Sequence, residues 1–218
     1  MKPQSDPERV LIVGRSPSVL LEAVEILRGR GFLADATNQF DSVLDEYDVA
    51  ELDIVVFGGQ VPPDTKQYLR EQIAATNPDT TFIQGLAGIP GLIAAQVAGA
   101  GQREPANESV VSYDTERRVV QLNLDDPAHV TIDAYWHTSL TPPEPKSTSL
   151  QVLNTELAKG SHSVPLPAEV PSEAAFVTAT AGTTVHAFTA SPMPQRVAAG
   201  GGASSLPPVA PVTTHNHN

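Results

Sequence analysis

The sequence contains no cysteine, which excludes disulfide bonds, thiolate metal ligands and cysteine nucleophiles. Positive charge is also scarce, because 13 Lys and Arg residues stand against 25 Asp and Glu residues and the formal net charge is −12. This balance repels nucleic acid and anionic membrane surfaces, and no basic stripe offsets it. We therefore expect no nucleic acid and no membrane among the partners of this protein.

Long apolar runs are missing as well. No run approaches the ~20 apolar residues of a membrane-spanning helix, and the N-terminal arm, residues 1–8, lacks the apolar core of a signal peptide. We therefore expect a cytoplasmic protein. The hydrophobic fraction of 40% and the charged fraction of 17% are typical of a folded chain, and 218 residues suffice for two domains.

What the chain does contain begins with a buried strand. Residues 10–13, Val-Leu-Ile-Val, form an apolar run that ends at Gly14 and Arg15. Ser16 suits the N-cap of a helix and Pro17 its first position, so the main-chain N–H groups of the next turn face the end of the strand. Such a helix start can bind an anion.

Three further strand-like segments follow, separated by helical segments. We predict strands at residues 32–36, 52–57 and 80–84, and helices at residues 18–28, 41–47, 64–75 and 92–98. This alternation is typical of parallel βαβ units. Residues 9–100 are therefore expected to form an α/β domain with a parallel sheet and three layers. Ligands of such domains bind beyond the carboxyl ends of the strands.

The hydrophobic period changes to two beyond a polar connector at residues 101–108. In residues 128–136, for example, apolar and polar side chains alternate, as they do in strands with one wet face. Short strands of this kind, broken by turn residues, predict an all-β sandwich over residues 109–190. Trp136 has the same parity as Ile132, so we expect it to anchor the core.

The remaining residues, 191–218, form a Pro/Gly/Ala-rich tail with few large side chains. Such a composition buries too little apolar surface to offset the entropy of ordering. We expect a tail that is flexible on its own.

The sequence predicts no catalytic residue and no metal ligand. His129, Asp133 and His137 share one face of a predicted strand, but residues four apart on a strand are about 13 Å apart, too far for one ion to reach. The acidic residues between 41 and 51 fit a solvated helix face.

The first domain resembles a response-regulator receiver domain over residues 9–88, on the strings 10–20, 31–36 and 53–58. The receiver family has an acidic pair after its first strand, a phosphate-accepting aspartate after its third and a lysine after its fifth. At the first two positions this sequence has Gly14-Arg15 and Gly58, and the lysine has no counterpart. The resemblance therefore implies a pseudo-receiver that keeps the scaffold without the phosphoryl-transfer groups.

The same residues also resemble a Rossmann-like nucleotide domain of the short-chain reductase type. Gly14 follows the first strand, Asp35 is placed at the end of the second, and Gly58-Gly59 follow the third. The resemblance departs from the family because Ser16 replaces the second glycine of its fingerprint and the reductase Tyr-x-x-x-Lys pair is absent. It implies NADP or NAD binding. The residues that would bind the cofactor are Gly14, Arg15, Ser16, Asp35, Gly58 and Gly59.

The second domain resembles immunoglobulin-like modules of the fibronectin type, for which residues 157–166 have the turn-then-strand pattern. Such modules bind, space or assemble. The first hypothesis is thus a non-catalytic interaction or assembly protein that needs no cofactor and whose partner is a protein or a second copy of the chain. The alternative is a reductase-like protein that binds NADP or NAD.

Overall fold

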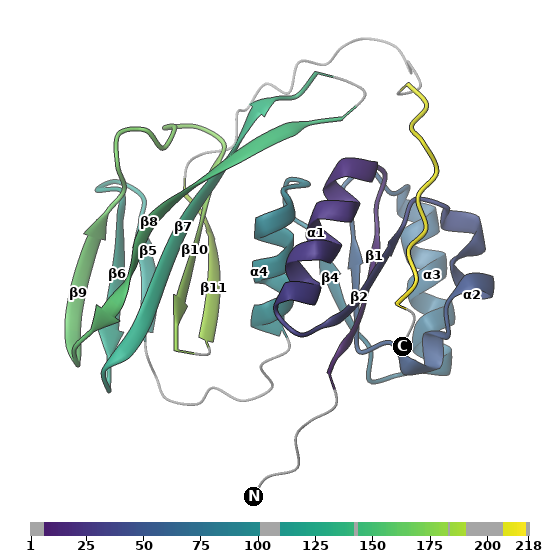
Figure 1. Cartoon of the computed structure of the whole chain (residues 1–218), viewed down its shortest axis with the longest axis horizontal. Helices are drawn as coiled ribbons and strands as arrows, with labels where there is room; N and C mark the ends of the chain where they lie inside the picture. The colour runs from purple at the N-terminus through teal and green to yellow at the C-terminus, as the bar shows by residue number, and fades with distance from the viewer. Residues whose placement is uncertain (1–6, 101–109, 142–143, 183, 191–206, 217–218) are drawn as a thin grey trace, which may run out of the picture. The chain divides into compact units, whose positions relative to one another are not determined.

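The computed structural model describes residues 7–100, 110–141, 144–182, 184–190 and 207–216. The chain forms two compact units. The first comprises the described residues of 1–97 together with those of 208–218, and the second lies within 98–207. The first is a parallel α/β unit and the second an all-β unit (Figure 1), which confirms the predicted fold class.

The α/β unit is built on a four-stranded parallel sheet in the order β2-β1-β3-β4. Its strands are β1 (Arg9–Val13), β2 (Leu33–Thr37), β3 (Ile54–Phe57) and β4 (Thr81–Gln84). Its helices are α1 (Pro17–Gly29), α2 (Val43–Glu46), α3 (Pro63–Thr76) and α4 (Pro90–Ala100), with 3-10 turns η1 (Phe40–Ser42) and η2 (Val49–Glu51).

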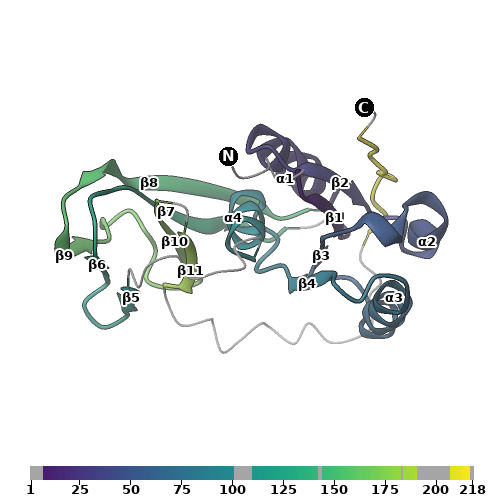
Figure 2. The same cartoon turned by 90° about the horizontal axis from the view of Figure 1, so that it is seen from below.

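The central strand β1 is buried on both faces, which explains its unbroken apolar run. Val10 and Ile12 pack in the cluster formed by α1 and α4, whereas Leu11 and Val13 pack in the cluster formed by α2 and α3. Figure 2 shows these helix pairs on opposite sides of the sheet, so the unit has three layers. Leu20, Ala23, Val24 and Leu27 form the buried face of α1, as the helical spacing predicts.

The all-β unit consists of two antiparallel sheets in the orders β11-β10-β7-β8 and β5-β6-β9. Its strands are β5 (Val110–Asp114), β6 (Val119–Leu124), β7 (Ala128–Ser139), β8 (Lys146–Leu157), β9 (Gly160–Pro165), β10 (Ala175–Ala181) and β11 (Thr184–Thr189). Leu122 of β6 and Ile132 of β7 belong to one hydrophobic core. Because side chains of both sheets share that core, the two sheets form a sandwich.

Trp136 does not anchor this core as predicted. It is partly buried and packs against the core, whereas the fully buried positions are occupied by aliphatic residues such as Leu122 and Ile132. Trp136 pairs with Ala175, the first residue of β10, so it lies at the end of that ladder. The periodicity correctly places the Trp136 side chain on the core-facing side of β7. It carries no information about where the neighbouring strand β10 begins.

No helix in the described part of the chain is long and apolar enough to cross a membrane. The described end of the predicted tail is residues 207–216, of which 208–216 belong to the α/β unit and lie along β2. We call these residues the C-terminal segment. In the structure they pair with β2, a partner that their composition does not reveal.

Candidate functional site

Five of the six predicted cofactor-binding residues lie together at the carboxyl ends of two neighbouring strands. Gly14, Arg15 and Ser16 follow β1, and Gly58 and Gly59 follow β3. The two strands pair directly, with Val13 opposite Phe57. These loops are therefore side by side, where ligands of parallel α/β sheets bind.

Close packing accounts for two of these glycines without a ligand. A Cβ atom on Gly58 would lie 3.2 Å from the Cα atom of Gly14, and one on Gly14 would lie 3.1 Å from Cδ2 of Leu20. The Gly58 N–H also donates a hydrogen bond of 2.8 Å to the Val13 carbonyl oxygen. The glycines allow the two loops and α1 to approach one another.

Arg15 and Ser16 supply the polar groups of this strand end. The Arg15 guanidinium lies 3.5 Å from Oε1 of Gln60. The main-chain carbonyl oxygen of Arg15 accepts a hydrogen bond of 3.4 Å from Nδ2 of Asn38. Ser16 is the N-cap residue of α1 and its carbonyl oxygen accepts from Leu20, although its side chain makes no capping hydrogen bond. A cation and a helix start can attract an anion. Among the described residues, no cluster of three or more His, Asp or Glu side chains could hold a metal ion.

Asp35 is not part of this group, so its predicted place at the end of the second strand is wrong. It lies in the middle of β2, opposite Leu11, because β2 continues to Thr37. Its carboxylate pairs with the Arg28 guanidinium at 2.8 Å. It also accepts a hydrogen bond of 3.2 Å from the Thr214 hydroxyl.

That hydrogen bond belongs to a second site, which we call the β2 edge: the outer side of residues 35–38. The C-terminal segment, drawn in yellow in Figure 1, runs antiparallel to β2 with Thr213 opposite Thr37. Two main-chain hydrogen bonds flank this pair. The Asn38 N–H donates to the Val212 carbonyl at 3.0 Å, and the Thr214 N–H donates to the Ala36 carbonyl at 2.9 Å.

Side chains complete the pairing. The Asn38 carboxamide accepts from the Val212 N–H at 2.8 Å and donates to the Ala210 carbonyl at 2.7 Å. The Thr214 hydroxyl accepts from the Ala36 N–H at 2.8 Å. The binding of this segment therefore depends on particular side chains and not only on main-chain pairing.

Tyr47, which directly follows α2, joins the site through its hydroxyl group. The hydroxyl lies 3.0 Å from the Thr214 carbonyl and 3.2 Å from the Ala36 carbonyl. Burial raises the pKa of the Tyr47 phenol, and the carboxylates of Asp35 and Glu46 raise that pKa further. The phenol is therefore a neutral hydrogen-bond donor at physiological pH.

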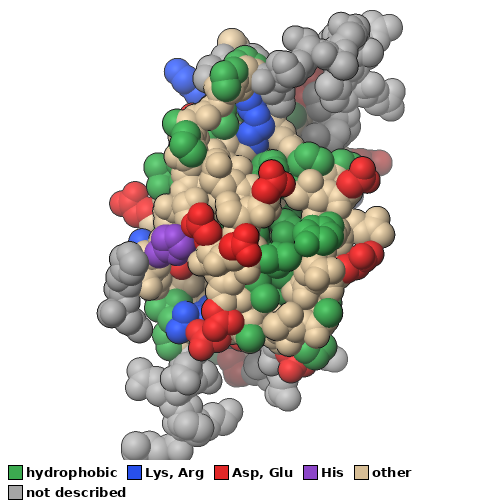
Figure 3. Space-filling view, turned by 90° about the vertical axis from the view of Figure 1, so that its right-hand side faces the viewer, with side chains coloured by type: hydrophobic (Ala, Val, Ile, Leu, Met, Phe, Trp, Pro, Cys, Tyr) green, Lys and Arg blue, Asp and Glu red, His purple; other side chains and the backbone are tan. Residues whose placement is uncertain are grey.

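The His215 ring packs on the Tyr47 ring. The two rings stack with centroids 5.2 Å apart, and the His215 Nε2 atom lies 3.4 Å from the Glu46 carboxylate. Glu46 belongs to the acidic group between residues 41 and 51, whose carboxylates are exposed. Acidic side chains are spread over the face that Figure 3 presents.

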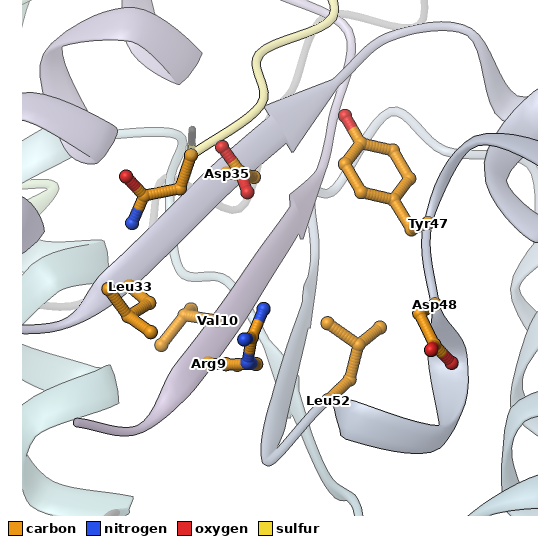
Figure 4. Close-up of a pocket in the computed structure, with 8 residues that line it drawn as sticks. Arg9, Val10, Leu33, Asp35, Tyr47, Asp48 and Leu52 are labelled. Carbon is orange, nitrogen blue, oxygen red and sulfur yellow. The ribbon is translucent and has the colours of Figure 1, made fainter. Parts of the chain in front are cut away.

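A small cavity of about 60 Å³ lies next to this site, between β1, β2 and Tyr47. Figure 4 shows Asp35 and the Tyr47 hydroxyl at one end and Arg9 with Asp48 at the other; Asn216 also contributes to the lining. Pockets for small organic ligands are typically about 300–1,000 Å³. This cavity has room for water molecules and not for a nucleotide.

Sequence reasoning missed Asn38, Tyr47 and Thr214 because their partners are more than 160 residues away in some of these hydrogen bonds. The only local signal is the run Val212-Thr213-Thr214, since β-branched residues favour extended backbone. The proline-rich composition around this run masks it.

The comparisons with known proteins assign no family. No family model matches the chain, and no curated protein matches it. Among solved structures, two crystal structures of beta-glucosidase from Listeria innocua, in complex with glucose and with isofagomine, align with TM-scores of 0.29 and 0.28 and identities of 10% and 11%. The alignments cover 86% of this chain and 46% of those chains, so the protein spans less than half of their length. At such TM-scores the likeness assigns neither fold family nor activity.

Proposed function

We propose that the protein is a non-catalytic interaction protein whose α/β unit binds an extended peptide segment. The observation that carries this proposal is the pairing of the C-terminal segment with the β2 edge, through main-chain groups and through Asn38, Tyr47 and Thr214. Addition of an extended segment to an exposed sheet edge is a recurrent mode of peptide recognition.

The strand-end loops support a scaffold without phosphoryl chemistry. Receivers need a carboxylate nucleophile and a carboxylate-bound metal, and the corresponding positions here are Gly58 and Gly14-Arg15. The all-β unit supports the same proposal. Its three-stranded and four-stranded antiparallel sheets are similar to those of immunoglobulin-like and fibronectin-like modules, which commonly serve in binding and assembly.

Incubation with acetyl phosphate and magnesium, followed by mass spectrometry, tests the non-catalytic scaffold. We expect an unchanged mass, because the strand ends offer no carboxylate pair to hold the metal and no aspartate at the Gly58 position. A conventional receiver domain is the positive control. A stable phosphoryl adduct on an aspartate of residues 9–100 would overturn the proposal.

The second candidate function is binding of NADP or NAD, and the adjacency of Gly14, Arg15 and Ser16 to Gly58 and Gly59 favours it. A titration with NADP, NAD and ATP, followed by thermal unfolding, separates the two functions. A ligand at 100 times its Kd stabilises a protein by about 2.7 kcal/mol, which raises Tm by several degrees. The interaction proposal predicts no shift. A shift with NADP that Arg15→Ala abolishes would put the nucleotide function first.

A further inference from the structure

We infer that the β2 edge is a sequence-selective peptide site, and that the C-terminal segment of a second copy of this chain fits it as the segment of the same copy does. This inference rests on the proposed interaction function and names its partner. Four features of the site carry it: the outward-facing main-chain groups of β2, the Thr214 hydroxyl, the Asn38 carboxamide and the shallow burial of the segment.

The first feature is the position of β2 at the edge of the sheet. Its inner side pairs with β1 from Arg9↔Leu33 to Val13↔Thr37, so the outer main-chain groups need other partners. The Ala36 N–H, the Ala36 carbonyl and the Asn38 N–H find those partners in the C-terminal segment.

The second feature is the use of the Thr214 hydroxyl as acceptor and donor at once. In a regular antiparallel ladder the Ala36 N–H would bond to the carbonyl of residue 214. Here it donates to the Thr214 hydroxyl, which in turn donates to Asp35. The carbonyl of Thr214 is thereby left for the Tyr47 hydroxyl. A single hydroxyl meets both requirements, whereas a valine side chain of similar shape meets neither.

The third feature is the Asn38 carboxamide, which holds the segment on both sides of Pro211. It bonds to the Ala210 carbonyl and to the Val212 N–H. The N–H groups of Val212 and Thr214 point toward β2, and the residue between Ala210 and Val212 needs no N–H for this pairing. Pro211 is therefore compatible with the site, and its fixed φ angle reduces the entropy lost on binding.

The fourth feature is the shallow burial of the segment. None of residues 207–216 is fully buried, and hydrogen bonds hold the segment to β2. Segments with few buried apolar contacts open at low free energy without global unfolding. Because the groups on the β2 edge do not distinguish one copy of the segment from another, an opened edge accepts the segment of a second copy. The segment of the same copy competes at an effective concentration in the millimolar range.

The test uses two complementary full-length variants. In the acceptor, Val212→Pro with Thr214→Pro removes the two N–H donors that face β2 and empties the edge. In the donor, Asn38→Ala weakens the edge and leaves the segment intact. We expect the mixture to form a 1:1 complex by native mass spectrometry and light scattering, while each variant alone is monomeric. A donor that also carries Thr214→Val is the matched control and should bind the acceptor about tenfold or more weakly.

A synthetic peptide of residues 207–216 provides the second measurement. Added to the acceptor, it should shift the amide resonances of Ala36 and Asn38, which also shows that the acceptor is folded. Its Thr214→Ser form should bind within a few-fold, whereas its Thr214→Val form should bind about tenfold or more weakly, as expected for loss of hydrogen bonds at a partly buried site.

Two results would overturn the inference. One is equal binding of the Ser and Val peptides, which would indicate unselective edge addition. The other is absence of the donor–acceptor complex at concentrations where the peptide binds. The non-catalytic function is tested separately, by incubation with acetyl phosphate and by nucleotide titration. Failure of this inference is therefore distinguishable from failure of that function.

Discussion

Tyr47 shows how one residue connects the core of the α/β unit to the β2 edge. Its hydroxyl reaches the Thr214 and Ala36 carbonyls, and its ring stacks on His215. The pKa of Tyr47 is raised from its ordinary value of 10.0, mainly by burial. The unfolded chain therefore releases this proton at lower pH than the folded chain does, so stability from this group is complete below pH 10 and falls as the pH rises above it.

The first prediction at the residue scale follows from this loss of stability at high pH. Thermal unfolding between pH 8 and pH 11 should show a loss of stability above about pH 10, and Tyr47→Phe should make that loss smaller. Tyr68→Phe is the matched control, because the Tyr68 side chain is exposed. The pKa of Tyr113 is also raised by burial, so a residual slope is expected in Tyr47→Phe. Identical pH profiles for the native chain and Tyr47→Phe would contradict the assignment.

At the scale of single elements, strand β6 contributes three buried side chains to the core of the sandwich. Val120, Leu122 and Leu124 of β6 are buried, while Gln121 and Asn123 between them are exposed. The strand lies in the middle of its sheet, between β5 and β9. Pairing with both neighbours fixes its register, and the register fixes which side chains face the core. A one-residue slip of β6 would expose all three apolar side chains.

Leu122→Ala should therefore lower the free energy of unfolding by about 2–5 kcal/mol, the range for removal of buried leucine side chains. Gln121→Ala on the solvent face should change it by less than about 0.5 kcal/mol. Trp136→Ala should cost less than a fully buried aromatic residue, because Trp136 is only partly buried. Chemical denaturation monitored by circular dichroism measures all three. Equal values for Leu122→Ala and Gln121→Ala would show that β6 does not face the core.

At the scale of the whole molecule, the first unit is made of two stretches of sequence, 1–97 and 208–218, and the second unit is inserted between them. The chain thus leaves the α/β unit near the end of α4, after Val97, and returns to it with the C-terminal segment. The return is made by polar contacts at the β2 edge and not by a large apolar surface. The segment that pairs with the β2 edge is therefore the one that follows the sandwich in the sequence.

Limited trypsin digestion tests this organisation. Arg103 and Arg196 lie in the polar connector and in the proline-, glycine- and alanine-rich stretch, whose compositions predict ready cleavage. We expect early cuts at these two arginines, after which the released peptide 197–218 should dissociate on dilution, because its described residues bury little apolar surface. An early cut between Leu11 and Phe82, with both arginines resistant, would show that the division into units is wrong.

Periodicity and turn residues determined the fold class by themselves. The apolar run of β1, the helical spacing of α1 and the period-two pattern of β6 each follow from local burial, which neighbouring residues record. The adjacency of Gly14 to Gly58 also followed from the sequence, since parallel strands end at one side of a sheet.

Only the tertiary structure decided where β2 ends, how deeply Trp136 is buried and what pairs with the sheet edge. The spacing of Asp35 from Gly14 suits a nucleotide site at a strand end, but the register with β1 extends β2 to Thr37. The C-terminal segment binds through hydrogen bonds between residues about 175 positions apart, such as Thr37 and Thr213 with a separation of 176. Composition predicts whether a segment can bury apolar surface by itself, and it contains no information about an edge strand elsewhere in the chain that needs hydrogen-bond partners.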